Sequence, residues 1–322
     1  MVEALARALA SAAVIVSGGE ALVDLVPAGA EGDLLAPRLG GGPYNVAIAA
    51  ARLGVPTAFL SRVSTDAFGD ALVRRLQESG VDTSLVQRGA EPTTLAVVTL
   101  DDDSSARYSF YTDGTADRLV ADPGPLPDGT AALSVGTLGM VLEPGAHVYE
   151  TVLRREHGRG VLTALDPNIR ADMISDADAY RVRFASWLPS VHLLKLSLDD
   201  AGWLAGVTDI DDVLTSARSW LDAGPRAVVL TKGADGVTLL TSSGVEVTVP
   251  GIAVEVVDTI GAGDTVQGAI LAWLVRHQVK DTSALSEREC RELLSFACRA
   301  AAVTVSRSGA EPPTERELQQ CV

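Results

Sequence analysis

Short apolar runs alternate with helical patterns along most of the chain, and this alternation restricts the fold more than any other feature. The runs are VIV at 14–16, TAFLSRV at 57–63, LSVG at 133–136, VLTALD at 161–166, HLLKLS at 192–197 and AVVLTKG at 227–233. Runs that are apolar throughout predict strands buried on both faces. Buried strands separated by helices predict a mainly parallel sheet with helices on both sides, which is a three-layer αβα sandwich.

Two of the intervening helices have clear ends in the sequence. The segment NVAIAAARLG at 45–54 reads as a helix of small residues that Gly54 closes. The segment DAFGDALVRRLQESG at 66–80 is amphipathic, with Asp66 as its expected N-cap and Gly80 as its stop. Both helices fall between predicted strands, as the layered fold requires.

One stretch departs from this alternation. TLAVVTL at 94–100 and ARYSFYT at 106–112 flank the acidic turn DDDSS at 101–105, which predicts a hairpin with a solvated turn. Together with ALVDLV at 21–26, this hairpin could form a small sheet apart from the main one. We therefore expect a single domain over 1–322, in which about 18–38 and 92–114 form a small β-sheet lid.

Composition excludes several classes of protein. The chain has 322 residues, 47% of them hydrophobic, which is enough for a large core. Its net charge of -16 argues against a nucleic-acid or anionic-membrane partner. The only cysteines, Cys290, Cys298 and Cys321, have neither disulfide-framework nor metal-site spacing, which fits a reducing cytoplasm.

The segment VDTIGAGDTVQG at 257–268 combines a glycine-rich turn with two carboxylates and a following helix, expected from near Asp264 to about His277. The first turn of a helix has free N–H groups and a positive dipole end, and glycine lets a ligand approach them closely. The backbone of Gly261, Ala262 and Gly263 could therefore hold a phosphoryl group, with Asp264 placed to accept a proton. An ordinary helix cap by Asp264 explains this stretch equally well.

Three further segments place polar groups near turns. GGGPYN at 40–45 is a second glycine-rich turn, in which Asn45 can both donate and accept hydrogen bonds. Asp24 in GEALVD could bind two neighbouring sugar hydroxyls, and TKGADG at 231–236 is a third glycine-rich turn, between two strands. Each of these reads alone as an ordinary loop. The sequence contains neither a GxxxxGK[ST] phosphate loop nor a GxGxxG dinucleotide fingerprint after its first strand, which counts against an oxidoreductase.

Taken together, these motifs resemble the ribokinase/PfkB family of carbohydrate kinases, and within it the fructokinase-type enzymes. DTIGAGD at 258–264 is similar to the family's C-terminal signature, and GGGPYNVAIAAARLG at 40–54 to its N-terminal one. Five further matches follow the family's order: GEALVDL at 19–25, FLSRVSTDAFGDALVRRLQESGVDT at 59–83, LDPNIR at 165–170, KLSLDDAGWL at 195–204 and TKGADG at 231–236. The resemblance covers nearly the whole chain and implies a ribokinase-like fold.

The resemblance also implies a role for each matching residue in the transfer of phosphate from MgATP to a sugar. Asp264 would be the general base, and the N–H groups of Gly261, Ala262 and Gly263 would form an anion hole. The sugar hydroxyls would be held by Asp24, Gly41, Gly42 and Asn45, and Arg170 would steady the substrate or the phosphates. The nucleotide site would comprise Lys195, Ser197, Thr231, Lys232, Gly233 and Gly236. A homodimer formed through the lid is also implied.

The chain departs from the family pattern at the cation sites. The family's KxNxxE element, which arranges Mg²⁺ through water, reads here with Ser197 and Asp200 in place of its Asn and Glu. The resemblance implies a Mg²⁺ role for Asp200 through water. It also implies a possible K⁺ site at Asp258, with carbonyls from 304–312.

A second departure concerns the substrate. Relatives that act on 2-keto-3-deoxygluconate often carry FYR where this chain has FYT, so Thr112 replaces an arginine able to pair with an acid. We therefore expect a neutral hexose, fructose first. The alternatives are a 2-keto-3-deoxygluconate kinase, a ribose or nucleoside kinase, and a sugar or nucleotide sensor without turnover.

Overall fold

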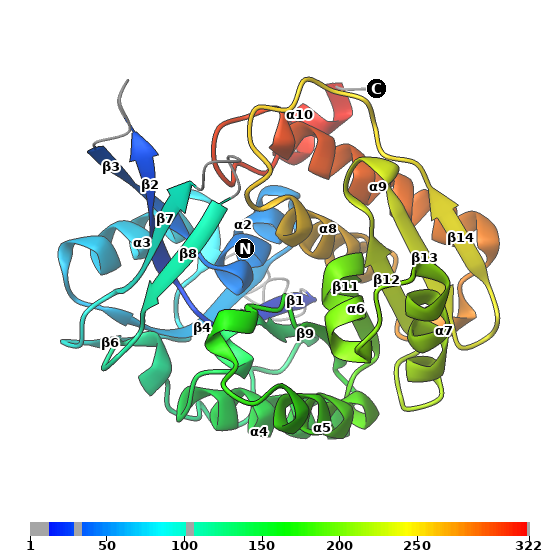
Figure 1. Ribbon diagram of the computed structural model, residues 1–322, viewed down its shortest axis with the longest axis horizontal. Helices are drawn as coiled ribbons and strands as arrows, with labels where there is room; N and C mark the ends of the chain where they lie inside the picture. The colour runs from blue at the N-terminus through cyan, green and yellow to red at the C-terminus, as the bar shows by residue number, and fades with distance from the viewer. Residues whose placement is uncertain (1–12, 29–33, 101–105, 321–322) are drawn as a thin grey trace, which may run out of the picture.

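The computed structural model describes residues 13–28, 34–100 and 106–320 and contains one large and one small sheet (Figure 1). Neighbouring strands of the large sheet follow the order β14–β13–β12–β11–β10–β9–β1–β4–β5, and β6 also pairs with β4. These strands are β1 (Val14–Gly18), β4 (Thr57–Ser64), β5 (Val81–Asp82), β6 (Val86–Gly89), β9 (Thr130–Gly136), β10 (Leu162–Asp166), β11 (Leu193–Ser197), β12 (Ala227–Thr231), β13 (Val237–Thr241) and β14 (Glu246–Val249). Only the pairs β12–β13 and β13–β14 are antiparallel, so the prediction of a mainly parallel sheet is confirmed.

Helices cover both faces of the large sheet (Figure 1). One layer contains α2 (Gly42–Arg52), α3 (Ala67–Glu78), α8 (Ala262–Arg276), α9 (Glu287–Val305) and α10 (Glu315–Gln320), and the other contains α4 (Gly145–Gly158), α5 (Ala177–Trp187), α6 (Leu198–Ala205) and α7 (Ile210–Leu221). Successive residues of a strand pack against opposite helix layers: Ile15 and Val229 pack with α8, whereas Val16 and Val228 pack with the layer that contains α4. This explains why the strands are apolar throughout.

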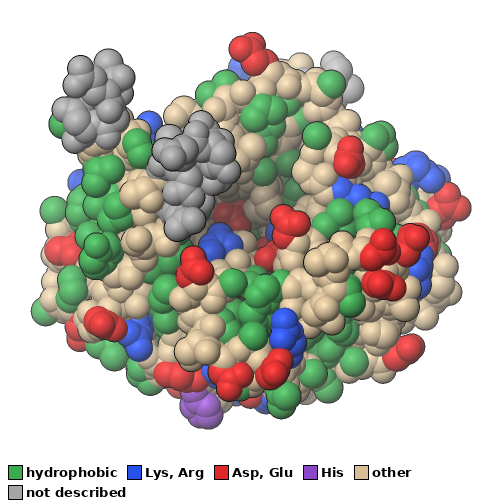
Figure 2. All heavy atoms as spheres, viewed as in Figure 1, with side chains coloured by type: hydrophobic (Ala, Val, Ile, Leu, Met, Phe, Trp, Pro, Cys, Tyr) green, Lys and Arg blue, Asp and Glu red, His purple; other side chains and the backbone are tan. Residues whose placement is uncertain are grey.

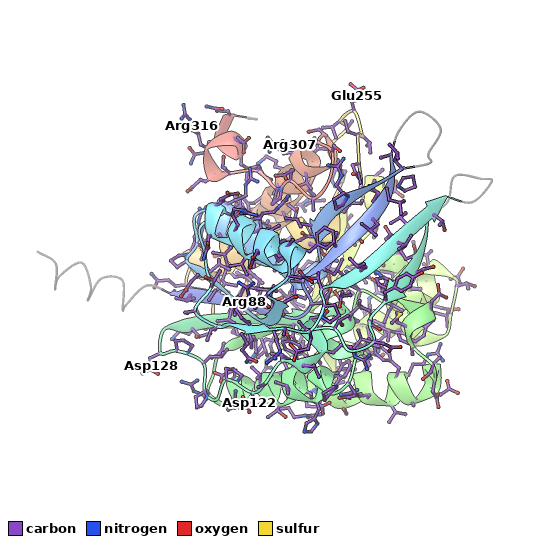
Figure 3. All side chains as sticks on the ribbon, turned by 90° about the vertical axis from the view of Figure 1, so that its left-hand side faces the viewer. Arg88, Asp122, Asp128, Glu255, Arg307 and Arg316 are labelled. Atoms are coloured by element: carbon purple, nitrogen blue, oxygen red, sulfur yellow. The ribbon has the colours of Figure 1, made fainter. Side chains whose placement is uncertain are left out.

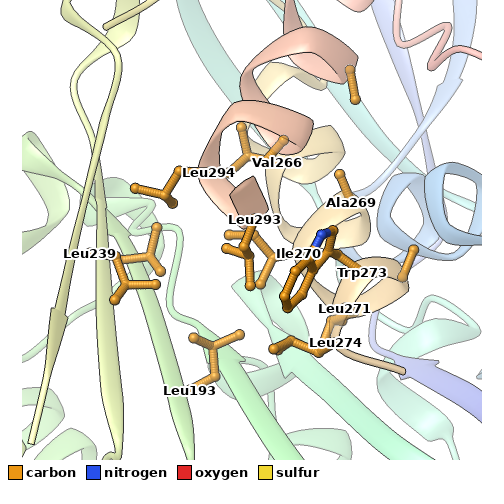
Figure 4. Close-up of a cluster of buried hydrophobic side chains, with 14 of the residues drawn as sticks. Leu193, Leu239, Val266, Ala269, Ile270, Leu271, Trp273, Leu274, Leu293 and Leu294 are labelled. Atoms are coloured by element: carbon orange, nitrogen blue, oxygen red, sulfur yellow. The ribbon is translucent and has the colours of Figure 1, made fainter. Parts of the chain in front are cut away.

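Helix α8 lies at the centre of its layer, between α2 and α9 (Figure 4). Every residue from Asp264 to Leu274 is buried. A Cβ atom on Gly268 would lie only 2.7 Å from the Cβ of Ala49, so glycine is required for α8 to approach α2 this closely. The site residues at the start of α8 are therefore fixed by a helix embedded in the core.

Two helix starts differ from the prediction. Helix α2 begins at Gly42 rather than at 45, because Pro43 in its first turn already has a helical φ. Helix α8 begins at Ala262 with Gly261 as its N-cap, at φ 76°, so Asp264 lies within the first turn and is not the cap. For α3 the expectation is confirmed, since the Asp66 carboxylate accepts the N–H of Gly69.

The small sheet has the order β3–β2–β7–β8 and stands beside the α2 and α3 layer (Figures 1 and 3). Its strands are β2 (Leu22–Ala28), β3 (Leu34–Gly40), β7 (Thr94–Leu100) and β8 (Ala106–Tyr111). The predicted hairpin is β7–β8, and its turn at 101–105 lies outside the described residues. Strand β3 lies mostly within the predicted lid range of about 18–38, but it was not identified as a strand: it contains Pro37, which an edge strand tolerates. Among the described residues, no helix has the length and apolar character needed to cross a membrane.

Candidate active site

A cavity of about 270 Å³ lies at the carboxyl ends of the parallel strands, where open α/β sheets bind ligands. Its lining includes groups that follow β1, β9 and β10 and the start of α8, and strand β8 adds the rings of Tyr108 and Phe110. The two rings stack, with centroids 6.0 Å apart. Figure 2 shows this face hollowed near its centre, with acidic and basic side chains inside the hollow. The small sheet therefore forms one wall of the cavity.

Asp264 faces this cavity from the first turn of α8. Asn45 Nδ2, on α2, donates a hydrogen bond of 2.9 Å to Asp264 Oδ2. Burial raises the pKa of Asp264 to about 6, against the opposing effects of Asn45 and of the Lys195 ammonium. The carboxylate is therefore mostly ionised at pH 7, and its pKa is close enough to 7 for it to act as a general base.

Asp24 and Arg170 line the cavity beside Asp264. Partial burial raises the pKa of Asp24 to about 6, although the positive charge of Arg170 lowers it. Arg170 Nη1 is held by Asn168, whose side-chain oxygen accepts at 2.8 Å. Gly41, Gly42 and Asn45 also line the cavity. The structure thus brings all five predicted sugar-binding residues together.

Lys195 lies beneath the start of α8. Its Nζ is 2.8 Å from Asp166 Oδ2, and a Cβ placed on Gly263 would lie 2.9 Å from that Nζ. Lys195 was predicted in the nucleotide site, but it lines the first cavity. Asp166 was not predicted to have a role. Its Oδ1 atom is buried and has no hydrogen-bond partner within the described part of the chain.

A second cavity, of about 460 Å³, adjoins the first. Thr231, Gly233 and Gly236 line it, as predicted for a nucleotide site, and apolar residues of α9 and of 252–256 form much of the rest. Thr259 and Gly263 line both cavities. The two cavities therefore meet at the first turn of α8, where backbone N–H groups and the helix dipole attract an anion.

Two predicted residues form a helix cap instead of lining either cavity. Ser197 caps α6 in a reciprocal capping box with Asp200. Asp200 Oδ2 accepts the N–H of Ser197 at 3.2 Å, and Oδ1 accepts the N–H of Ile169 at 2.8 Å. Both oxygens are thus engaged, and the structure gives no support to the prediction that Asp200 arranges Mg²⁺ through water.

Three other predicted residues also lie outside the cavity linings. Asp258 joins two loops, because Oδ1 accepts the N–H of Ile260 and Oδ2 accepts the N–H of Gly309. Lys232 precedes a short 3₁₀ turn, and Thr112 is buried at the end of β8. The position of Thr112 therefore does not support a role for it in the choice of substrate. Within 13–28, 34–100 and 106–320, no cluster of three or more His, Cys, Asp or Glu residues could hold a metal ion.

Comparisons with known proteins agree with this geometry. The model of the pfkB family of carbohydrate kinases matches residues 13–317. A fructokinase of Rhizobium leguminosarum bv. trifolii is 40% identical over 262 residues, which are 80% of this chain and 78% of that protein. The chain belongs to the pfkB family of carbohydrate kinases. It is a phosphotransferase that acts on an alcohol group of a sugar.

Solved structures show the same fold. Fructokinase from Xylella fastidiosa with bound ATP has a TM-score of 0.85 at 27% identity, covering 95% of this chain and 98% of that one. A double mutant of fructokinase from Vibrio cholerae O395, with fructose, ADP and potassium bound, has a TM-score of 0.84 at 25% identity, covering 96% and 98%. The fold is therefore ribokinase-like, with a separate small sheet.

Proposed function

We propose that this enzyme transfers the γ-phosphate of MgATP to a primary hydroxyl of fructose. The observation that carries the proposal is the junction of the two cavities at Gly263, directly beside the Asp264 carboxylate. Relatives named fructokinase, and similar structures with fructose, ADP or ATP bound, support this choice of substrates. The first cavity would hold the sugar and the second the nucleotide.

The transfer needs a base and a stabilised phosphoryl group. Asp264 accepts the proton as the hydroxyl oxygen attacks the γ-phosphorus, and the bond from that phosphorus to the bridging oxygen of ADP breaks. The N–H groups at Gly261 and Gly263, together with the Lys195 ammonium, stabilise the charge on the phosphoryl oxygens. Ala262, which was also predicted to be part of the anion hole, instead donates its N–H to the carbonyl of Thr259 at 3.3 Å. Tyr108 and Phe110 of the small sheet shield the site from water that would otherwise hydrolyse ATP.

The residues near the junction also fit cation binding. Mg²⁺ neutralises charge on the β- and γ-phosphates when it is bound with ATP. Asp166 fits a hydrated Mg²⁺ better than Asp200 does, because Asp166 Oδ1 is buried without a partner whereas both oxygens of Asp200 are engaged. For K⁺, Asp258 would fix two loops, at Ile260 and Gly309, whose carbonyl oxygens could serve as ligands.

The charges in the first cavity favour a neutral sugar. Asp24 and Asp264 line it and are mostly ionised at pH 7, whereas its cations are Arg170 and Lys195, and Lys195 is already paired with Asp166. The carboxylate of 2-keto-3-deoxygluconate would enter next to Asp24 and Asp264, at a cost in free energy.

The test measures ADP release from MgATP, with K⁺ present, for fructose, ribose, 2-keto-3-deoxygluconate, glucose and adenosine. We expect fructose to have the highest kcat/KM. A preference for 2-keto-3-deoxygluconate would support the kinase activity but contradict fructose as the substrate. If no substrate causes ADP release while fructose still binds in calorimetry, the protein is a sensor without turnover.

Asp264→Asn tests the mechanism in the same assay. We expect kcat to fall by roughly 10²–10⁴-fold, because the general base is lost, while the Kd for fructose changes little. Asp281→Asn, which removes a carboxylate from the cap of a remote turn, is the control and should keep full turnover. Unchanged turnover in Asp264→Asn would exclude the assigned base.

The assembly and location of the enzyme remain predictions. Leu34, Leu35 and Tyr111 on the small sheet are exposed, which supports a homodimer formed through the lid. The cytoplasm, where ATP is plentiful, is the expected compartment.

A further inference from the structure

Glu20 is a buried carboxyl group in the sugar cavity to which the proposed transfer gives no role. Its side chain is only 2% exposed. Oε1 accepts the N–H of Gly42 at 2.9 Å, and Oε2 accepts the N–H of Gly139 at 3.0 Å. One carboxyl group thus uses both oxygens on the backbone of two segments that are distant in sequence.

Both segments form part of the sugar cavity. Gly42 is the first residue of α2, the helix that carries Asn45, and Gly41 and Gly42 line the cavity. Gly139 belongs to the turn at 137–140, whose first two residues also line the cavity, and a Cβ placed on Gly42 would lie 2.5 Å from Thr137 Oγ1. The two hydrogen bonds of Glu20 therefore fix two neighbouring segments of the cavity lining relative to each other.

Glu20 also faces the base of the small sheet through Asp117. Both carboxyl groups line one cavity of about 10 Å³, which Arg118 and Tyr149 also line. Asp117 Oδ1 accepts the hydroxyls of Thr94, at 2.6 Å, and Thr115, at 2.9 Å. Thr94 begins β7 and Thr115 follows β8, so Asp117 holds both ends of the hairpin that supplies Tyr108 and Phe110.

The charged groups around Glu20 have opposing effects on it. Burial, with a smaller contribution from the charge of Asp117, raises the pKa of Glu20 to about 8, although the N–H groups of Gly42 and Gly139 favour the carboxylate. Arg118 directs its guanidinium to the carbonyls of Thr112 and Glu143, and Tyr149 donates to the carbonyl of Gly19. Neither side chain is bonded to the Glu20 carboxyl group, so neither lowers the pKa of Glu20 from about 8.

We propose that Glu20 is a positioning residue for sugar binding, which fixes the start of α2 and the 137–140 turn against the base of the small sheet. The proposal rests on the proposed function in one respect, namely that the first cavity holds the sugar. Glu20 acts through backbone N–H groups and takes no part in the proton transfer. It should therefore control sugar affinity and leave the chemical step nearly unchanged.

Glu20→Gln is the test, because glutamine has one acceptor oxygen where glutamate has two. One of the two N–H groups then faces an amide NH₂ and loses its partner. At pH 9, where Glu20 of the wild type is ionised, we expect the KM and the calorimetric Kd for fructose to rise about tenfold, with kcat and the KM for MgATP within about twofold of wild type. Glu156→Gln is the matched control, since Glu156 is equally buried and accepts a backbone N–H, from Leu126, far from the cavity.

The pH profile separates positioning from a general loss of stability. Above pH 7, Asp24 and Asp264 are already ionised, so the fructose KM of the wild type should fall further as Glu20 ionises between about pH 7 and 9. That slope should be absent in Glu20→Gln. If Glu20→Gln does not fold, Asp117→Asn replaces it: removing the Asp117 charge should move the slope to lower pH.

The outcomes distinguish the two proposals. An unchanged fructose Kd in folded Glu20→Gln, or a slope above pH 7 that survives the substitution, would overturn the role of Glu20. An equal loss in Glu156→Gln would also overturn it. If the wild type phosphorylates no sugar, the proposed function fails, and the calorimetric Kd values still decide the role of Glu20.

Discussion

At the scale of single residues, Asp264 shows that the site is not built for maximum stability. Burial raises its pKa in the folded state to about 6, from the ordinary value of 3.8. Between these two pH values the folded state therefore binds a proton that the unfolded state releases. The free energy of unfolding falls as the pH rises from 3.8 through 6. At pH 7 the buried charge is a cost that function requires.

Asp264→Asn should therefore make the protein more stable while it removes activity. We expect its free energy of unfolding at pH 7 to exceed that of the wild type by about 1–3 kcal/mol, because the neutral amide is not penalised by burial. The gain should shrink to less than half near pH 4.5, and urea denaturation at both pH values measures it. Asp258→Asn is the contrast: asparagine has one acceptor oxygen where aspartate has two, so one of two backbone N–H groups loses its partner and the variant should be less stable at pH 7. A variant at Asp264 that is no more stable than wild type would contradict this account.

At the scale of elements, the site depends on how α2 and α8 cross. Both helices begin at the cavity, and their first turns are joined by the bond from Asn45 to Asp264. Deeper in the core, Gly268 lets them approach, since its added Cβ would meet Ala49 and, at 3.0 Å, the carbonyl of Val46. A change in the contact between Gly268 and Ala49 should therefore alter the position of the general base, Asp264.

Gly268→Ala tests this coupling. Forcing the helices apart should lower the free energy of unfolding by about 1–3 kcal/mol and reduce kcat severalfold, because Asn45 no longer holds Asp264 in place. Gly158→Ala, near the end of α4, is the matched control, as nothing lies within 4 Å of its added Cβ. The control should keep its kcat and be as stable as the wild type or slightly more so. Full turnover in a destabilised Gly268→Ala would show that the helices are not coupled to the base.

The elements also show what sequence reasoning can and cannot find. The strands were predicted because burial on both faces leaves a continuous apolar run, and Asp264 with its glycines was found because one short segment contains them all. Glu20 was missed because its partner Gly139 lies 119 positions away and no local pattern records the contact. Ser197 and Asp200 were assigned to the nucleotide and metal because they match the family's KxNxxE element, and their spacing of three residues also fits a capping box. Only the fold distinguishes the two.

At the scale of the whole molecule, the net charge opposes one substrate. The chain carries a charge of -16, and charged side chains such as Asp122, Asp128 and Glu255 lie at its periphery (Figure 3). MgATP is also an anion. Within the described part of the chain, the groups at the junction that attract it are the start of α8, Arg170 and Lys195, and they act at short range. Long-range repulsion and short-range attraction respond differently to salt.

The enzyme should therefore capture MgATP faster when salt is added. Raising tetramethylammonium chloride from about 10 to 150 mM shortens the Debye length from roughly 30 to 8 Å, which screens the distant charges more than the junction. At fixed K⁺, we expect kcat/KM for MgATP to rise severalfold, and kcat/KM for uncharged fructose at saturating MgATP to stay constant. A fall in kcat/KM for MgATP would mean that the local cations dominate at all distances.

The central place of α8 has a consequence for biosynthesis. The residues that face α8 on β1 and α2 leave the ribosome early, but their partner follows late: Asn45 and Asp264 are 219 positions apart. At a synthesis rate of about 5–20 residues per second, the apolar side of α2 stays exposed for on the order of ten to forty seconds before α8 is made. The nascent chain must therefore pass most of its synthesis with an open core, which makes it a natural client for chaperones. Catalytic competence arrives with the last fifth of the polypeptide.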